Sequence, residues 1–98
     1  MAAITPTRRR RTAGPDDARG DRPWNVVVLN DDHNTFEGVA FALARVIPGV
    51  GYDQGMRLAN RIHSTGRAIV WSGHKERAEL YHEQLGGYGL TMGPLRPS

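Results

Sequence analysis

The chain has 98 residues, of which 39% are apolar and none is cysteine, and its formal net charge is +3. This length allows one small domain, and the lack of cysteine excludes disulfides, zinc–thiolate sites and thiol catalysis. No stretch is long and apolar enough for a transmembrane helix, and the first residues lack the apolar core of a secretory signal. We therefore expect a soluble, cytoplasmic protein.

The positive charge is concentrated at the start of the chain. Residues 1–23 contain six Arg and three Asp and so carry the whole net charge, whereas the remainder has seven basic and seven acidic residues. Residues 1–22 have too few large apolar side chains to order themselves. We predict a flexible basic extension over residues 1–22 and a core domain over residues 23–98. The Arg8–Arg11 block leaves open a contact with an acidic surface or with nucleic acid.

The core domain is predicted to begin with a strand and a helix. The apolar and β-branched run at 24–29 is typical of a largely buried strand. Apolar residues at helical spacing then predict a helix over 35–47. Asn34 with Glu37 three residues later resembles a capping box, with Asn as the capping residue.

Four further elements are predicted after this helix. Asp53 is a plausible N-cap for a second helix over 54–65, and Gly66 suits a left-handed C-terminal cap. Pro94 indicates that the last strand lies at a sheet edge or ends there. The remaining elements are a strand over 67–72, a helix over 74–85 and a strand over 90–95. The resulting order, β-α-α-β-α-β, predicts an α+β fold with the helices clustered on one face of the sheet.

Polar side chains gather where the first strand ends. Asn30, Asp31 and Asp32 form a tight strand-to-helix turn, and His63 lies on the apolar stripe of the second predicted helix. Asx residues favour turns for purely local reasons, and a lone His on such a stripe is usually structural. If Asn30, Asp31 and His63 lie close together in the fold, one interpretation is a pocket that binds a protonated amine. A second interpretation is a metal site formed by Asp31, Asp32 and His63. It is less favoured, because these residues do not have the spacing of a known metal-binding motif.

Two stretches resemble a known family. VVVLNDDHNTFEGV and ANRIHSTGRAIV, followed by a short helix and a last strand, are similar to ClpS, the adaptor of the Clp protease. The resemblance covers roughly residues 23–95. It implies three antiparallel strands packed against three helices, and a binding protein without catalytic residues, cofactor or metal. Such a protein binds N-degrons, the free N-termini of substrates that begin with Leu, Phe, Tyr or Trp.

The resemblance also assigns roles to individual residues. It implies that Asn30, Asp31 and His63 hold the α-amine and first peptide group, while Asp32 helps to shape the turn. The expected side-chain pocket consists of Asn34, Phe36, Val39, Ala59 and Ile62. Glu76 matches a position at which the family touches the N-terminal domain of the AAA+ unfoldase, ClpA or ClpC, which feeds ClpP. The N-terminal extension would engage the same unfoldase, and we expect a monomeric adaptor.

Three residues depart from the family pattern. The family commonly has Thr at the position of Asn34 and Met at the positions of Phe36 and Ala59. We hypothesise that the larger Phe36 fills the space that Ala59 gives up, so that the pocket is shifted rather than lost. The alternative function is a small nucleic-acid-binding protein that acts through its Arg-rich extension, although the neutral core domain itself gives no reason to expect nucleic acid.

Overall fold

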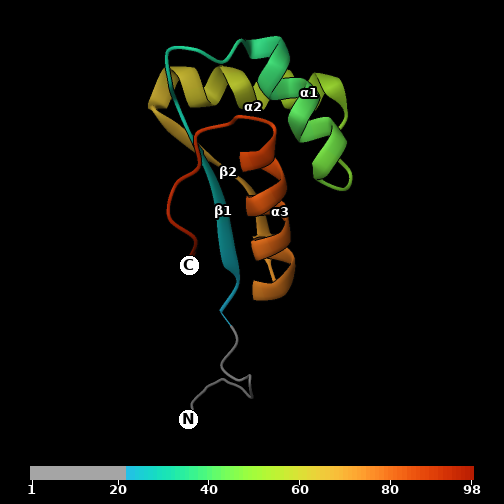
Figure 1. Ribbon diagram of the computed structural model, residues 1–98, viewed down its shortest axis with the longest axis vertical. Helices are drawn as coiled ribbons and strands as arrows, with labels where there is room; N and C mark the ends of the chain where they lie inside the picture. The colour runs from blue at the N-terminus through green and yellow to red at the C-terminus, as the bar shows by residue number, and fades with distance from the viewer. Residues whose placement is uncertain (1–21) are drawn as a thin grey trace.

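The computed structural model describes residues 22–98 and contains three strands and three helices in the predicted order (Figure 1). The elements are β1 (Trp24–Leu29), α1 (Phe36–Val46), α2 (Tyr52–Thr65), β2 (Arg67–Gly73), α3 (Lys75–Gly87) and β3 (Arg96–Pro97). The α+β class is therefore confirmed. The predicted extension over residues 1–22, including the Arg8–Arg11 block, falls outside the described residues except for Arg22.

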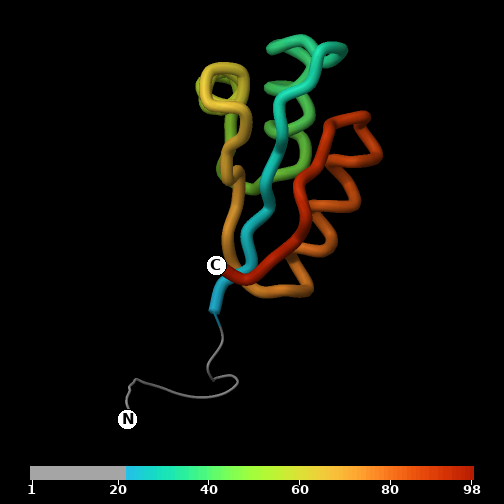
Figure 2. The backbone as a smooth tube through the Cα atoms, turned by 90° about the vertical axis from the view of Figure 1, so that its left-hand side faces the viewer, coloured from blue at the N-terminus to red at the C-terminus, as the bar shows by residue number. Residues whose placement is uncertain are grey.

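The three strands form one antiparallel sheet in the order β2-β1-β3. Figure 2 shows β2, β1 and the C-terminal segment side by side. In the register of β1 with β2, Val27 lies opposite Ile69 and Leu29 opposite Arg67. The central strand is thus β1, and its C-terminal end leads directly into the polar turn that the sequence singled out.

The two faces of β1 differ in burial, which refines the prediction of a largely buried strand: no residue of β1 is exposed, but only one face enters the core. Val26 and Val28 are fully buried, whereas Val27 and Leu29 are only half-buried. Alternate side chains of a strand point to opposite faces. Because the helices cover a single face, only every second apolar residue of this run can enter the core.

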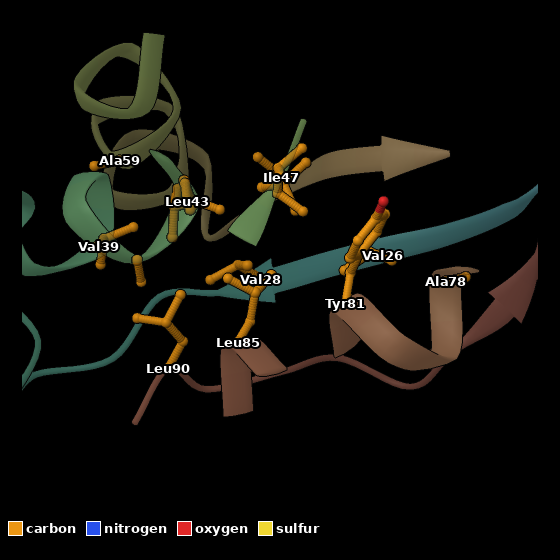
Figure 3. Close-up of a cluster of buried hydrophobic side chains, with 14 residues drawn as sticks. Val26, Val28, Val39, Leu43, Ile47, Ala59, Ala78, Tyr81, Leu85 and Leu90 are labelled. Carbon is orange, nitrogen blue, oxygen red and sulfur yellow. The ribbon is translucent and has the colours of Figure 1, made fainter. Parts of the chain in front are cut away.

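The hydrophobic core lies between the sheet and the helices. Leu43 of α1 and Leu85 of α3 are among its fully buried side chains, together with Val26 and Val28. Figure 3 shows this cluster, in which Tyr81 and Ala78 of α3 lie toward one end of β1 and Ala59 of α2 toward the other. The buried residues of α3 are Ala78, Tyr81 and Leu85, which lie three or four positions apart and so share one face of the helix.

Helices α1 and α2 approach closely at a glycine. A Cβ atom on Gly55 would lie 2.7 Å from the carbonyl oxygen and 2.9 Å from the Cα of Ala40. Contacts this short are not tolerated, so the missing side chain is what lets the two backbones meet. The spacing between α1 and α2 matters because the candidate site lies between them.

The helix ends correct two predicted caps. Thr35, not Asn34, is the N-cap of α1, and its hydroxyl accepts a hydrogen bond of 2.9 Å from the Gly38 N–H. Helix α2 begins at Tyr52 after Gly51, so Asp53 lies within its first turn, where a carboxylate still favours the helix dipole. Gly66 ends α2 with a φ of 94°, as predicted.

The C-terminal segment pairs with β1 less regularly than the predicted strand over 90–95. Only an isolated bridge joins Val28 to Met92, and the formal strand is limited to Arg96–Pro97. The Gly93 N–H still donates to the Val27 carbonyl, but Pro94 has no N–H to continue the ladder. His82 of α3 also contacts this segment: it is half-buried, with Nε2 2.9 Å from the Gly93 carbonyl oxygen.

Candidate functional site

The turn after β1 is organised by the Asp31 carboxylate. Its Oδ1 accepts hydrogen bonds from the backbone N–H groups of His33, at 3.1 Å, and Asn34, at 2.8 Å. Its Oδ2 accepts from the side-chain amide of Asn34, at 2.7 Å, and from the Thr91 hydroxyl, at 2.8 Å. A carboxylate offers about four lone-pair sites. The chain itself therefore supplies donors to both oxygens of Asp31.

These contacts fix the charge state of Asp31. Its side chain is only 12% exposed, and this burial by itself pushes the carboxyl pKa upward. The hydrogen bonds from the Asn34 backbone and side chain, Thr91 and the His33 backbone oppose burial and outweigh it. They hold the pKa of Asp31 well below its usual range, because each stabilises the charged form. A negative charge is thus retained at the end of β1.

Asn34 links the turn to the C-terminal part of the chain. Its side-chain nitrogen donates both to Asp31 and, at 2.9 Å, to the Gly89 carbonyl oxygen. Thr91 reaches the same carboxylate from beyond α3. Two segments nearly sixty residues apart in sequence are therefore joined at Asp31. The contribution of Thr91 was not predicted, because no local pattern marks a donor that distant.

The polar turn also lies against the C-terminal end of α2. The Asn30 N–H donates a hydrogen bond of 2.9 Å to the carbonyl oxygen of Gly66. Gly66 follows His63 by three residues. His63 is exposed rather than buried among core residues, which corrects the inward-facing placement that its helical stripe indicated. Its ring packs edge-on against Phe36, with the ring centroids 5.3 Å apart.

A small hollow brings most of the predicted site residues together. Its volume is about 40 Å³, and it lies between the turn, α1 and α2. The predicted residues that line it are Asn30, Asp31, Asn34, Phe36, Val39, Ala59, Ile62 and His63. Lining residues that the sequence did not single out are Val28, Leu29, Thr35 and Leu90. Residues with amide, carboxylate and imidazole side chains thus line the same small hollow as apolar residues.

Asp32 and Glu76 lie apart from this hollow. The Asp32 side chain is fully exposed, with Oδ1 3.8 Å from Nδ1 of His33, which is itself 66% exposed. Glu76 lies in the first turn of α3. Figure 1 shows that α3 begins at the end of the strands opposite to α1 and α2. Any contact made by Glu76 is therefore well separated from the hollow.

The metal hypothesis requires Asp31, Asp32 and His63 to converge. Over residues 22–98, no three His, Asp or Glu side chains lie close enough together to hold a metal ion. The same range contains no helix that is both long and apolar enough to span a membrane. The charged residue of the hollow, Asp31, instead accepts hydrogen bonds from uncharged donors.

Comparison with known proteins decides the family. The model of the ATP-dependent Clp protease adaptor protein ClpS matches residues 19–93. The chain belongs to the ClpS family. It is 54% identical over 74 residues to the ClpS adaptor of Thermosynechococcus vestitus, which covers 76% of this chain and 79% of the relative. The ClpS adaptor of Streptomyces coelicolor is 34% identical over 70 residues, or 71% and 72% of the two chains.

A solved ClpS structure has the same fold. ClpS2 of Agrobacterium tumefaciens, bound to L-phenylalaninamide, superposes with a TM-score of 0.69 at 25% identity. The match covers 79% of this chain and 98% of ClpS2. The resemblance noted in the sequence is thus confirmed, and this chain is a ClpS-type adaptor of the Clp protease.

Proposed function

We propose that the hollow binds the free N-terminus of proteins that begin with Leu, Phe, Tyr or Trp. The observation that carries this proposal is the pairing of two surfaces in one hollow. Asn30, Asp31 and His63 supply polar groups, and Phe36 and Ile62 supply apolar surface. An N-terminal hydrophobic residue presents the same pairing, because its α-ammonium group and its side chain are bonded to the same carbon atom.

Asp31 contributes mainly through its charge. Because both of its oxygens already accept hydrogen bonds from the chain, the direct acceptors for an ammonium group are the Asn30 side-chain oxygen and an imidazole nitrogen of His63. The donors around Asp31 are uncharged, so its negative charge is not cancelled within the site. Charge-assisted hydrogen bonds of this kind contribute about 1.5–3 kcal/mol each.

The apolar side of the hollow must open to admit a large side chain. Its volume is about 40 Å³, whereas a cavity that holds a benzene ring measures about 150 Å³. Phe36 is half-buried, packs against the core cluster and touches His63, so we infer that its ring moves when the hollow opens. Ala59, which has a small side chain, lines the same hollow. This arrangement supports the hypothesis that Phe36 occupies the volume given up at Ala59.

The ligand of the related structure has the expected chemistry. L-phenylalaninamide carries a free α-amine, a benzyl side chain and an amide in place of the next peptide bond. ClpS2 of Agrobacterium tumefaciens is bound to that molecule. The hollow described above offers an acceptor cluster for the amine and apolar surface for the ring.

Delivery is the second part of the proposal. The adaptor acts as a monomer in the cytoplasm and passes its cargo to a ClpA- or ClpC-type AAA+ unfoldase with ClpP. Glu76, at the far end of α3, contacts the unfoldase, and the basic N-terminal extension assists. The separation of Glu76 from the hollow lets cargo and unfoldase bind at the same time. The protein carries out no chemistry of its own.

Fluorescence anisotropy with a labelled peptide that begins with Phe tests the binding step. We expect an affinity near the micromolar range for the free amine, and about ten-fold or greater loss when the amine is acetylated or His63 is changed to Ala. Affinity declines above pH about 8, where the α-amine loses its proton. Equal binding of the free and acetylated peptides would contradict the proposal.

A further inference from the structure

The face of the sheet that the helices leave uncovered is unusually apolar. Val27 and Leu29 of β1 point away from the buried side, and Ile69 lies directly opposite Val27 on β2. Ile69 is 54% exposed. The solvated face of an antiparallel sheet normally carries polar side chains at such positions. We call the apolar strip formed by Val27, Leu29 and Ile69 the outer strip.

Two shallow hollows extend along the outer strip. One, of about 310 Å³, lies toward the C-terminal segment and is lined by Leu29, Pro94 and Arg96 among others. The other, of about 430 Å³, lies toward β2 and is lined by Arg61 and Ile69 among others. Val27 and Arg67 line both hollows. Together the two hollows form one continuous surface across the sheet.

The charges around this surface have a single sign. Arg61, Arg67 and Arg96 line the two hollows, and no acidic side chain does. Within residues 22–98, none of these three arginines lies at ion-pair distance from a carboxylate, and none donates a side-chain hydrogen bond to the protein. The core domain is formally neutral, so its positive charge is enriched on this face.

We propose that this face is a docking surface for an extended, acidic segment of a partner protein, with apolar side chains between its carboxylates. Arg61, Arg67 and Arg96 supply guanidinium groups that pair with carboxylates. The outer strip supplies apolar contact between them, which a purely electrostatic site would not need. A nucleic acid fits less well, because its phosphates would leave Val27 and Ile69 without apolar partners.

An extended conformation suits the geometry. Every second side chain of an extended segment points to the same face, so carboxylates and apolar groups that take turns along that face can lie over the arginines and the outer strip. β2 is also an edge strand of the described sheet, and an exposed edge is a common site for strand addition. Leu29 borders both this face and the N-terminus-binding hollow, but the arginines do not line that hollow.

The probe, called the Glu–Val peptide, is a short N-acetylated, labelled peptide with Ser at every second position and with Glu and Val taking turns at the positions between, so that both face the sheet. It is titrated into the full chain by fluorescence anisotropy. Acetylation keeps it out of the amine-binding hollow. Two matched peptides, one with Lys in place of Glu and one with Gly in place of Val, separate charge from apolar contact. We expect only the Glu–Val peptide to bind with a dissociation constant well below about 1 mM, and we expect its affinity to fall as the salt concentration rises.

Variants then locate the binding site. Arg67→Glu and Arg61→Glu should each weaken the Glu–Val peptide about ten-fold, and Ile69→Thr about three-fold. Arg57→Glu is the matched control, since Arg57 lies on the same helix but its side chain donates to Gln54. Arg57→Glu and His63→Ala should leave the affinity unchanged, which separates this surface from the amine-binding hollow.

Three results would overturn the proposal. The first is no binding of the Glu–Val peptide up to about 1 mM. The second is equal weakening by Arg57→Glu, which would show only nonspecific attraction. The third is tighter binding of an oligothymidylate probe that is lost with Arg67→Glu, which would assign the face to nucleic acid.

Discussion

The turn after β1 and the outer face of the sheet both carry charged side chains, but they use them differently. In the turn, Asp31 accepts four hydrogen bonds from its own chain. On the outer face, Arg61 and Arg67 have no carboxylate partner within residues 22–98. Side chains whose hydrogen bonds are satisfied hold a site in place. Unpaired surface charges contribute little to the free energy of unfolding and remain available to a partner. Substitutions in the turn should therefore lower both stability and binding of the N-terminal peptide. Substitutions on the outer face should leave both nearly unchanged.

Asp31→Ala should have the largest effect on the turn. It leaves the donors of Asn34, Thr91 and His33 without their acceptor, which costs about 1–3 kcal/mol of unfolding free energy, and it removes the charge that attracts the amine. We expect at least a ten-fold loss of peptide affinity by anisotropy. Asp32→Ala is the matched control, because the Asp32 side chain is fully exposed. Equal loss in both variants would contradict the central place given to Asp31.

The pH dependence of unfolding gives a separate readout for Asp31. Its pKa is lower in the folded state than in the unfolded chain, so the stability that it contributes is complete above pH about 4. That stability is lost as the pH falls toward the folded-state pKa. The difference in unfolding free energy between wild type and Asp31→Ala, measured by urea titration, should therefore shrink in acid.

Gly55→Ala should come next in size and tests whether the hollow depends on the closeness of α1 and α2. Ala is favoured over Gly in a helix by about 1 kcal/mol, but the new Cβ would lie 2.7 Å from the Ala40 carbonyl oxygen. Overpacking of this kind costs about 1–3 kcal/mol, so we expect net destabilisation in thermal unfolding and weaker peptide binding. Gly87→Ala, in α3 with no atom within 4 Å of the added Cβ, should be neutral or stabilising.

Ala59→Met should change selectivity more than stability. The added side chain enters the space beside Phe36 in the hollow of about 40 Å³, and we expect Trp and Tyr peptides to lose affinity before Leu peptides, by several-fold. Competition binding with peptides that differ only in their first residue measures this. Unchanged relative affinities would show that Phe36 and Ala59 do not share one volume.

Ile69→Thr should have the smallest effect and completes the comparison. The side chain is exposed and Thr keeps the β-branched shape that strands favour, so the change in unfolding free energy should stay within about 0.5 kcal/mol. Binding of the Phe peptide should not change. Destabilisation well beyond that value would mean that the outer strip supports the fold rather than a partner.

Local chemistry was enough to predict most of the fold. The β-branched run of β1, the helical spacing of α1 and the left-handed cap at Gly66 each depend on a few neighbouring residues. The short β3 could not be predicted, because its pairing depends on where Pro94 falls against β1. The cap of α1 was misassigned because Asn34 is drawn to Asp31 and Gly89 instead, which is a tertiary choice.

The candidate site also has features that the sequence predicts and features that depend on the fold. The polar cluster of Asn30 and Asp31 and the separate His63 were visible in the sequence, but their convergence rested on the family resemblance. The contact of Thr91 with Asp31 depends on how the chain returns after α3. The outer strip was hidden for a different reason, since an apolar run does not show which of its residues will face solvent.

Binding of a free N-terminus in the hollow can be located residue by residue with a ¹H–¹⁵N correlation spectrum of the full chain titrated with L-phenylalaninamide. We expect the shifted amides to cluster at the turn and around the hollow, including Asn30, Asp31, Phe36, Ala59 and His63. The N-acetylated form of the ligand should leave these signals in place. Shifts confined to the outer strip, or equal shifts with the acetylated ligand, would contradict the claim that this hollow recognises a free N-terminus.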